Sequence, residues 1–197
     1  MEFQELVRRR RMVRKFQPRP VPDEILLRVL EVARHGPSAG FSQGFDFLVL
    51  DEPGQVKRFF ELTNHPQFPY DEDKEFAPCY VLAISNTPAY LERYSRQDKE
   101  RFGLQKAEAW PVAFWDVDTG MAVMLILLAA IEDHLGAVFF GVNWGRAELL
   151  GELGVPQGCD LIGVIGLGYP IDAEEFDPAP FAARRRSLES MVHFGHW

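Results

Sequence analysis

The chain has 197 residues, of which 47% are hydrophobic and 25% are charged, and its formal net charge is −8 at pH 7. These values are typical of a globular protein with one sizeable core. The negative charge argues against binding of the whole protein to nucleic acid or to an anionic membrane. Two cysteines are too few for a disulfide scaffold, so we expect buried thiols. Because the N-terminus is charged rather than apolar, we also expect a cytoplasmic protein.

The first half of the chain is predicted to alternate helices with strands. Three prolines between residues 18 and 22 favour an extended connection. Apolar residues at helical spacing follow until Gly36 and Pro37. The segment 37–44 is small and polar, which is typical of a loop. We expect helices at residues 3–7, 22–33 and 55–62, strands at 45–50 and 79–85, and a surface loop at 65–76.

The segment 87–112 combines many charges with scattered aromatic residues, namely Tyr90, Tyr94, Phe102 and Trp110. One interpretation is a set of amphipathic surface helices. The other is a mobile lid whose aromatic side chains close over a ligand. The sequence leaves both interpretations open.

The residues from Asp116 to Leu135 are predicted to form a central helix. Acidic residues and Thr119 at its start suit the positive end of a helix, and Gly136 suits its end. All eleven residues from 121 to 131 are apolar, but a membrane span takes about 20. We therefore expect a buried helix that needs cover on every side, part of it from a second subunit.

The rest of the chain completes a single predicted domain, residues 1–197, with no repeat and no linker. The tail from residue 171 to residue 181 is acidic and contains two prolines, so we expect it to run over the surface. Before it we expect a strand at 137–142, a helix at 146–153 and a strand at 161–167, closed by Gly168-Tyr169-Pro170.

The sequence lacks the common catalytic motifs. The five histidines have no metal-binding spacing, and neither cysteine lies in a catalytic sequence. A Walker A loop is missing, and the glycines near residue 166 precede Tyr-Pro rather than the helix that a dinucleotide fingerprint requires. We therefore expect no metal and no catalytic side chain, but a bound cofactor that carries the chemistry.

Two basic clusters stand out on this acidic chain. They comprise Arg8, Arg9, Arg10, Arg11, Arg14 and Lys15 near the N-terminus, and Arg184, Arg185 and Arg186 near the C-terminus. Concentrated positive charge on an acidic protein suits a small anion such as phosphate better than a long polyanion. The alternative is that the clusters are solvated helix ends.

The sequence resembles the FMN-dependent nitroreductase family. Its opening, RRRMVRKFQPRPVPDEILLRVLEVARHGPSAGFSQ, is similar to the family's pattern of Arg-x-x-x-Arg/Lys-x-Phe, Pro-Val-Pro, an amphipathic helix and a Pro-Ser loop that ends near Gln. The apolar central helix, Gly-Tyr-Pro at 168–170, and the second basic cluster followed by Ser-Leu-Glu-Ser-Met-Val also fit. The match covers nearly the whole chain and is loosest at residues 64–112.

The resemblance implies an α+β fold in which a mostly antiparallel sheet has helices on both faces. It also implies an intertwined homodimer with two FMN sites at the interface, each built from both chains. The C-terminal tail, residues 171–197, would wrap around the partner and add an edge strand. The second subunit would then cover the apolar central helix.

The resemblance also implies which residues bind FMN. Arg10, Arg184 and Arg186 correspond to residues that hold the phosphate, a task that suits bidentate guanidinium groups. Arg14 corresponds to a basic residue near the ribityl chain and the N1–O2 edge of the ring, where a cation stabilises reduced flavin. The other correspondences are Arg11 and Met12 near the ribityl chain and phosphate, Pro37, Ser38 and Ala39 of the other subunit at the pyrimidine edge, and Phe139, Phe140 and Gly141 along one ring face, with a backbone N–H near N5.

Three positions depart from the family pattern. Met12 replaces a common serine and removes a hydroxyl near the phosphate, Phe41 stands where asparagine is frequent, and Gly44 stands where proline is frequent. Asn64 is a candidate for the polar residue that follows the second pair of helices. We expect FMN binding in spite of these changes and leave the acceptor open.

The resemblance implies an FMN-dependent oxidoreductase with a ping-pong cycle. NADH or NADPH would supply a hydride and leave, and a small organic acceptor such as a nitroaromatic or a quinone would then take its place. One alternative is a flavin-fragmenting enzyme like dimethylbenzimidazole synthase, whose Gly-Phe-x-Gln loop resembles residues 40–43. The others are a reductive dehalogenase like iodotyrosine deiodinase, and a flavin-binding protein without activity. We expect no nucleic-acid partner and no membrane.

Overall fold

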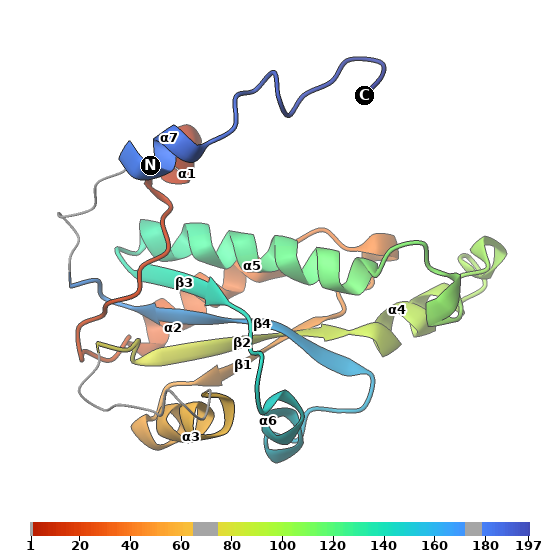
Figure 1. The fold of residues 1–197 in the computed structure, drawn as a ribbon. Helices are drawn as coiled ribbons and strands as arrows, with labels where there is room; N and C mark the ends of the chain where they lie inside the picture. Colours follow the sequence, from red (N-terminus) through yellow and green to blue (C-terminus); the bar gives the residue numbers. More distant parts are fainter. Residues whose placement is uncertain (1, 65–74, 172–178) are drawn as a thin grey trace.

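A computed structural model describes residues 2–64, 75–171 and 179–197 of the chain. Its strands form one antiparallel sheet in the order β1-β2-β4-β3. Figure 1 shows α5 along one face of this sheet, and α3 and α6 on the other face. The predicted α+β fold, a mostly antiparallel sheet with helices on both faces, is therefore confirmed. The strands are β1 (Phe45–Leu50), β2 (Cys79–Asn86), β3 (Gly136–Phe140) and β4 (Cys159–Gly168).

The helices follow the predicted order, with small differences at their ends. The central helix begins at Phe114 and ends at Glu132, two to three residues earlier than expected. The predicted loop at 37–44 contains a short 3-10 turn, Ala39–Phe41, and the predicted surface loop at 65–76 lies mostly outside the described residues. The α-helices are α1 (Phe3–Arg9), α2 (Asp23–Glu31), α3 (Pro53–Thr63), α4 (Thr87–Tyr94), α5 (Phe114–Glu132), α6 (Arg146–Glu152) and α7 (Ala179–Arg184).

The tail contains one helix, α7, whose residues are all exposed, as expected for a segment that runs over the surface. Residues 172–178, which belong to the same prediction, lie outside the described residues. Residues 185–197 contain no strand, so the edge strand that the resemblance implies for a partner stays a prediction. Figure 1 shows this C-terminal segment extending away from the sheet.

The two faces of β2 supply two separate parts of the core. Cys79, Val81 and Ala83 pack with α2 and α5 on one face, whereas Tyr80 and Leu82 pack with α3 and α6 on the other. This division follows from the two-residue period of a strand. Because helices cover both faces, β2 is a continuous apolar run rather than an alternating one.

Cys79 allows a test of this buried position through pH. Its side chain is 1% exposed, and burial raises the pKa of the thiol to about 12, above about 8.5 in an unfolded chain. The unfolded state therefore loses this proton first, so the stabilising contribution is present below pH 8.5 and is lost as the pH rises towards 12. We expect the free energy of unfolding in urea to fall by about 1 kcal/mol more in wild type than in Cys79→Ala between pH 8 and 9.5. Cys159→Ala should retain this fall, and equal slopes in wild type and Cys79→Ala would contradict the assignment.

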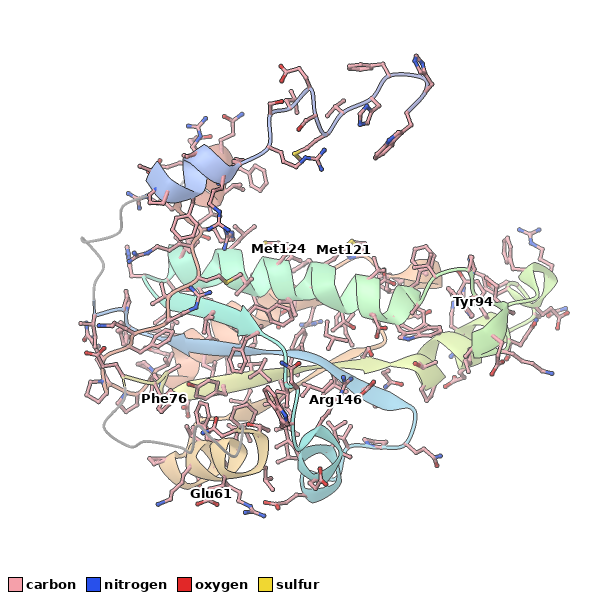
Figure 2. The ribbon with its side chains drawn as sticks, viewed as in Figure 1. Glu61, Phe76, Tyr94, Met121, Met124 and Arg146 are labelled. Atoms are coloured by element: carbon pink, nitrogen blue, oxygen red, sulfur yellow. The ribbon has the colours of Figure 1, made fainter. Side chains whose placement is uncertain are left out.

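The central helix α5 is buried on one side only. Seven of its 19 residues are buried, while Val117, Met121 and Met124 are 44%, 38% and 45% exposed. Figure 2 shows Met121 and Met124 on the side of α5 that faces away from the sheet. Among the described residues α5 alone is long and apolar enough to cross a membrane. Its packing on the sheet is that of a core helix, but the expected cover on every side is incomplete within one chain.

Residues 87–112 build a small aromatic core of their own. Tyr90, Tyr94 and Trp110 are buried against one another, with ring centroids 4.7 Å apart for Tyr94 and Trp110. The indole N–H of Trp110 donates to the carbonyl of Leu104 at 2.9 Å. These rings therefore hold α4 and the following turns together. Movement of this segment as a lid stays a prediction.

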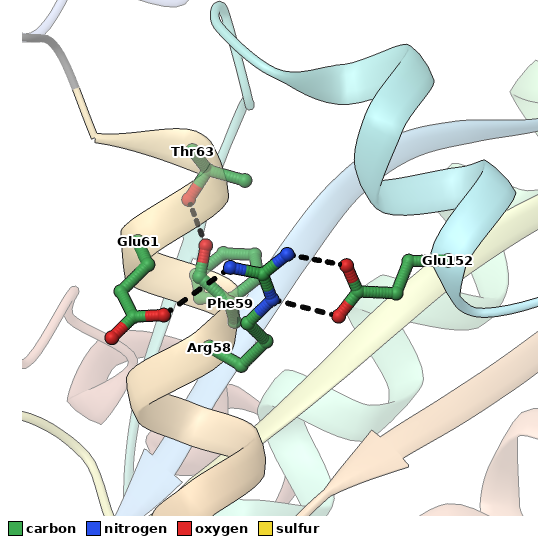
Figure 3. Close-up of polar contacts among 5 residues, drawn as sticks. All are labelled: Arg58, Phe59, Glu61, Thr63 and Glu152. Atoms are coloured by element: carbon green, nitrogen blue, oxygen red, sulfur yellow. Dashed lines mark hydrogen bonds and ion pairs between the residues drawn. The ribbon is translucent and has the colours of Figure 1, made fainter.

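An ion pair joins the two helices on the face of the sheet opposite α5. Arg58 of α3 donates through Nε and Nη2 to the two carboxylate oxygens of Glu152 on α6, at 2.8 and 2.7 Å, and through Nη1 to Glu61 at 3.3 Å (Figure 3). Thr63 donates to the carbonyl of Phe59 at 2.8 Å near the end of α3. The Arg58 network is solvent-exposed, so it fixes geometry more than it adds stability.

Candidate functional site

The N-terminal segment after α1 is fixed against the edge of the sheet. The backbone N–H of Val13 donates to the carbonyl of Ala137 on β3 at 2.8 Å, and that of Gln17 donates to Tyr169 at 2.8 Å. Phe16, 2% exposed, forms a bridge with Pro170. These contacts hold the arginines that precede Val13 beside β3, the edge strand of the sheet.

Basic residues from both ends of the chain meet in one cavity of about 330 Å³. Figure 1 shows α1 and α7 beside each other near one end of α5. The cavity lies between these two helices and the segment that follows α1. Its lining residues are Arg8, Arg10, Arg11, Met12 and Arg14 from the N-terminal part, and Phe181, Ala182 and Arg185 from the C-terminal part.

Arg185, a member of the second basic cluster to which no contact with FMN was assigned, supplies the C-terminal cation of this cavity. Arg184 is the last residue of α7. The Arg186 side chain donates to the hydroxyl and the carbonyl of Ser190. Consecutive residues at a helix end point in different directions, so three adjacent arginines cannot all face one cavity, and their order alone does not distinguish them. The roles given to Arg184 and Arg186 stay predictions.

The state of Arg10 indicates that this cavity suits an anion. Its Nη1 is buried and has no hydrogen-bond partner among the described residues. A buried donor without an acceptor costs about 1–3 kcal/mol, and more when it is charged. A phosphate oxygen would supply that acceptor in a charge-assisted hydrogen bond. The residues present therefore fit the phosphate of FMN.

Met12 connects this cavity to the edge of β3. Its sulfur accepts the backbone N–H of Phe139 at 3.4 Å. Met12 therefore makes a polar contact through its thioether, although it lacks the hydroxyl of the serine that is common at this position in the family. Together with the Val13–Ala137 bond, this contact covers the outer edge of β3 as far as Phe139. The strand ends at Phe140, and the exposed Gly141 follows directly beyond it.

The three residues predicted along the flavin ring differ in their surroundings. Phe139 and Phe140 are half-buried, and the ring of Phe140 lies 6.4 Å from that of Phe59 and 6.2 Å from that of Tyr80. Gly141 is exposed, and a Cβ at this position would meet nothing within 4 Å. The Phe140 side chain thus belongs to the core, and the open space lies at the backbone of Gly141.

The Pro37–Ala39 loop is anchored from below by a buried carboxylate. Asp118 of α5 is 2% exposed, and its Oδ2 accepts the backbone N–H of Ala39 at 2.8 Å and the hydroxyl of Tyr90 at 2.7 Å. Burial, followed by the hydrogen bond to Asp118, raises the pKa of Tyr90, which keeps the phenol protonated as a donor. Ser38 Oγ accepts the N–H of Gln43 at 2.8 Å and closes the loop.

Sequence reasoning missed the roles of Asp118 and Tyr90. The acids at the start of the central helix were interpreted as partners of the helix dipole, but Asp118 lies in the second turn and points inward. The sequence does contain one signal for an inward-pointing Asp118, namely that the helix has few other polar residues. The structure adds that the next residue, Thr119, is also buried.

The loop and the arginine cavity lie at opposite ends of α5. Asp118 holds the loop near the start of the helix, whereas Ile131 lines a neighbouring cavity with Arg9 and Arg11 near its end. Thirteen residues at about 1.5 Å each separate these positions by about 20 Å. One chain therefore does not bring Pro37, Ser38 and Ala39 to the arginines, and their meeting at one flavin requires a second copy.

An α+β sheet covered on both faces, with an arginine-lined cavity beside its edge strand, has the features of a protein that binds a small anionic ligand. The chain belongs to the nitroreductase family, whose model matches residues 7–169. This family uses FMN as cofactor with NAD(P)H as reductant, in agreement with the predicted oxidoreductase and cofactors. Within the described residues, no group of three or more histidine, cysteine or acidic side chains could hold a metal ion.

The chain is also similar to several relatives over most of its length. An NADH dehydrogenase/NAD(P)H nitroreductase of Methanothermobacter thermautotrophicus is 29% identical, over 90% of this chain and 84% of the relative. An iodotyrosine deiodinase of Nematostella vectensis is 29% identical, over 97% and 74%, and a 5,6-dimethylbenzimidazole synthase of Rhodobacter capsulatus is 25% identical, over 95% and 91%. These names include two of the alternative activities considered from the sequence.

Solved structures with a similar fold match this chain over nearly its whole length. A nitroreductase family protein of Clostridium difficile 630 has a TM-score of 0.72 at 24% identity, covering 100% of both chains. A nitroreductase from Exiguobacterium sibiricum 255-15, solved in complex with FMN, has a TM-score of 0.73 at 17% identity, covering 98% of this chain and 97% of that one.

Proposed function

We propose that the protein is an FMN-dependent oxidoreductase that passes electrons from NADH or NADPH to a small organic acceptor, such as a nitroaromatic or a quinone, in a ping-pong cycle. The observation that carries this proposal is Arg10, whose buried Nη1 has no partner among the described residues and which lines a cavity with arginines from both ends of the chain. Bound FMN would accept a hydride from the nicotinamide and deliver electrons to the acceptor.

The chain's own residues bind and orient in this proposal. Arg10 and Arg185 hold the phosphate, and Arg14 places a cation beside the ribityl chain and the ring. Arg184 and Arg186 are assigned to the same phosphate, in a tail that rearranges on the partner. Gly141 is exposed just beyond the end of β3, and its backbone N–H would donate a hydrogen bond to the ring. Positioning over the ring would contribute most of the catalysis.

A homodimer would complete the site. The uncovered side of α5 carries apolar residues at alternating spacings of four and three, which is the pattern of a helix that packs against another helix. A second copy on this face would bury the methionines and bring its own Pro37–Ala39 loop towards the arginine cavity. The residues of this seam are Val117, Met121, Met124, Leu128 and Ile131.

Anaerobic stopped-flow mixing with NADH or NADPH tests the proposal. The purified protein is expected to be yellow, and the visible absorbance of bound FMN should be lost on mixing and regained when a quinone is added. No loss with either nucleotide would contradict the proposal. Mass spectrometry of the aerated, reduced protein separates it from the flavin-fragmenting alternative, which would yield a shortened flavin product. Reduction without turnover by any acceptor would indicate a flavin-binding protein.

A further inference from the structure

Phe41 occupies an unusual position in the loop. Its ring is 75% exposed, and its backbone φ is +57°, between Gly40 at +63° and Gln43 at +48°. The left-handed region is a genuine outlier for a bulky residue such as phenylalanine and costs about 1–3 kcal/mol. A large apolar side chain is thus exposed to water, and its backbone is strained. Both features raise the free energy of the folded protein.

The surrounding hydrogen bonds impose this conformation. The Phe41 N–H donates to the carbonyl of Ser38 at 2.9 Å, and the Ser42 hydroxyl donates to that of Ala39 at 2.7 Å. Arg93 of α4 donates through Nε to the carbonyl of Gly40 at 2.9 Å. With the Asp118 anchor below, these bonds fix the backbone from which the exposed Phe41 ring projects.

The ring borders a cavity of about 400 Å³ between the loop and α4. Across the cavity, Arg93 pairs with Asp98 at 2.9 and 2.7 Å, and Arg96 pairs with Glu92 at 3.0 Å. These charges balance, so the cavity offers an exposed aromatic face without a net attraction for an anion. Its remaining lining residues are Gly40, Ser42 and Ala89.

We infer that Phe41 is the specificity-determining residue that stacks on planar aromatic acceptors and so selects them over non-aromatic ones. The inference rests on the proposed function, in which the loop of one copy faces the flavin of the other. An offset-stacked aromatic pair gains energy beyond the burial of its area. A ring carried on a backbone that is already fixed gives this contact at a lower entropic cost, which accounts for the strained conformation.

The test compares acceptors of two kinds in the flavin-loaded protein. Menadione, NADH and one proton give the hydroquinone and NAD⁺, whereas two ferricyanide ions take one electron each from NADH, giving NAD⁺ and one proton. Phe41→Ala is expected to lower kcat/KM for menadione about tenfold and to leave that for ferricyanide unchanged. Phe41→Tyr should retain the wild-type ratio. Phe41→Leu, which keeps apolar bulk without a ring, should resemble Phe41→Ala.

Ligand binding and thermal unfolding test the inference independently of turnover. Calorimetric binding of naphthalene-2-carboxamide, a flat aromatic that is not reduced, should weaken about tenfold in Phe41→Ala. Phe41→Gly should unfold at the wild-type temperature or above it, because glycine adopts a positive φ without strain. Phe102→Ala, which removes another exposed ring that does not line this cavity, is the matched control and should leave the acceptor ratio unchanged.

Four outcomes would overturn the inference. They are equal losses for both acceptors, an unchanged menadione rate in Phe41→Ala, a lower unfolding temperature in Phe41→Gly, and a change of oligomeric state in Phe41→Ala, which would make the ring an interface anchor. Failure of the proposed function gives a different result, since NADH would not reduce the wild-type protein at all.

Discussion

Arg10→Ala is expected to weaken FMN binding about 100-fold. Arg10 Nη1 is buried and lacks a partner among the described residues, so a phosphate oxygen would satisfy it fully. Hydrogen bonds to charged groups contribute about 1.5–3 kcal/mol each, and a loss near 3 kcal/mol corresponds to about two orders of magnitude in affinity. Fluorescence titration of the apoprotein with FMN measures this change directly.

Replacing Arg10 weakens FMN binding, but it is not expected to lower the stability of the apoprotein. Without an anion, the buried Nη1 of this half-buried guanidinium lacks an acceptor, which lowers stability. Arg10→Met fills a similar volume without a charge, so the apoprotein should unfold at the wild-type temperature or above it. The holoprotein should lose the added stability that wild type gains from FMN, since ligand binding stabilises the folded state by mass action.

Arg9→Ala is the matched control for both measurements. Arg9 lies one position away on α1, is exposed and pairs with Glu5 at 3.3 Å. It does not line the cavity of Arg10. Its removal should leave FMN affinity within about twofold, since an exposed ion pair contributes less than about 1 kcal/mol. A similar loss of affinity in Arg9→Ala and Arg10→Ala would show a diffuse electrostatic effect and contradict a specific phosphate contact.

Local pattern predicted the order and type of the elements because each has a clear period or stop signal. The continuous apolar run of β2 and the acid-rich start of α5 are signals of this kind. The pairing of β3 with β4 at the edge of the sheet is a long-range contact that no local pattern encodes. It is this edge position that leaves Gly141 open, so the location of the site depended on topology.

The apolar run of α5 shows a second limit of prediction from the sequence. Sequence alone described a helix apolar on all sides, and the structure divides those residues between a face on the sheet and a face without cover in one chain. Both faces are equally apolar, so hydrophobicity could not separate them. The same holds for Arg184–Arg186, where identical residues differ only in direction.

Asp118→Ala is expected to lower the free energy of unfolding by about 3 kcal/mol. It leaves two donors, the buried hydroxyl of Tyr90 and the part-buried N–H of Ala39, without their shared acceptor, and each such loss costs about 1–3 kcal/mol. For a chain of this size the midpoint of thermal unfolding should fall by roughly 6–12 °C. Asp118→Asn keeps one acceptor oxygen and should lose less.

Asp116→Ala is the control, because Asp116 lies on the same helix, is exposed, and binds neither donor. Its effect should stay within about 0.5 kcal/mol, as for ordinary surface substitutions. Tyr90→Phe removes one donor and should cost about 1 kcal/mol. The double variant Asp118→Ala/Tyr90→Phe should lose less than the sum of the two, because the phenol that Asp118→Ala leaves without an acceptor is then absent. Additive losses would mean that the carboxylate and the phenol stabilise the loop independently, and the shared anchor beneath Ala39 would have to be abandoned.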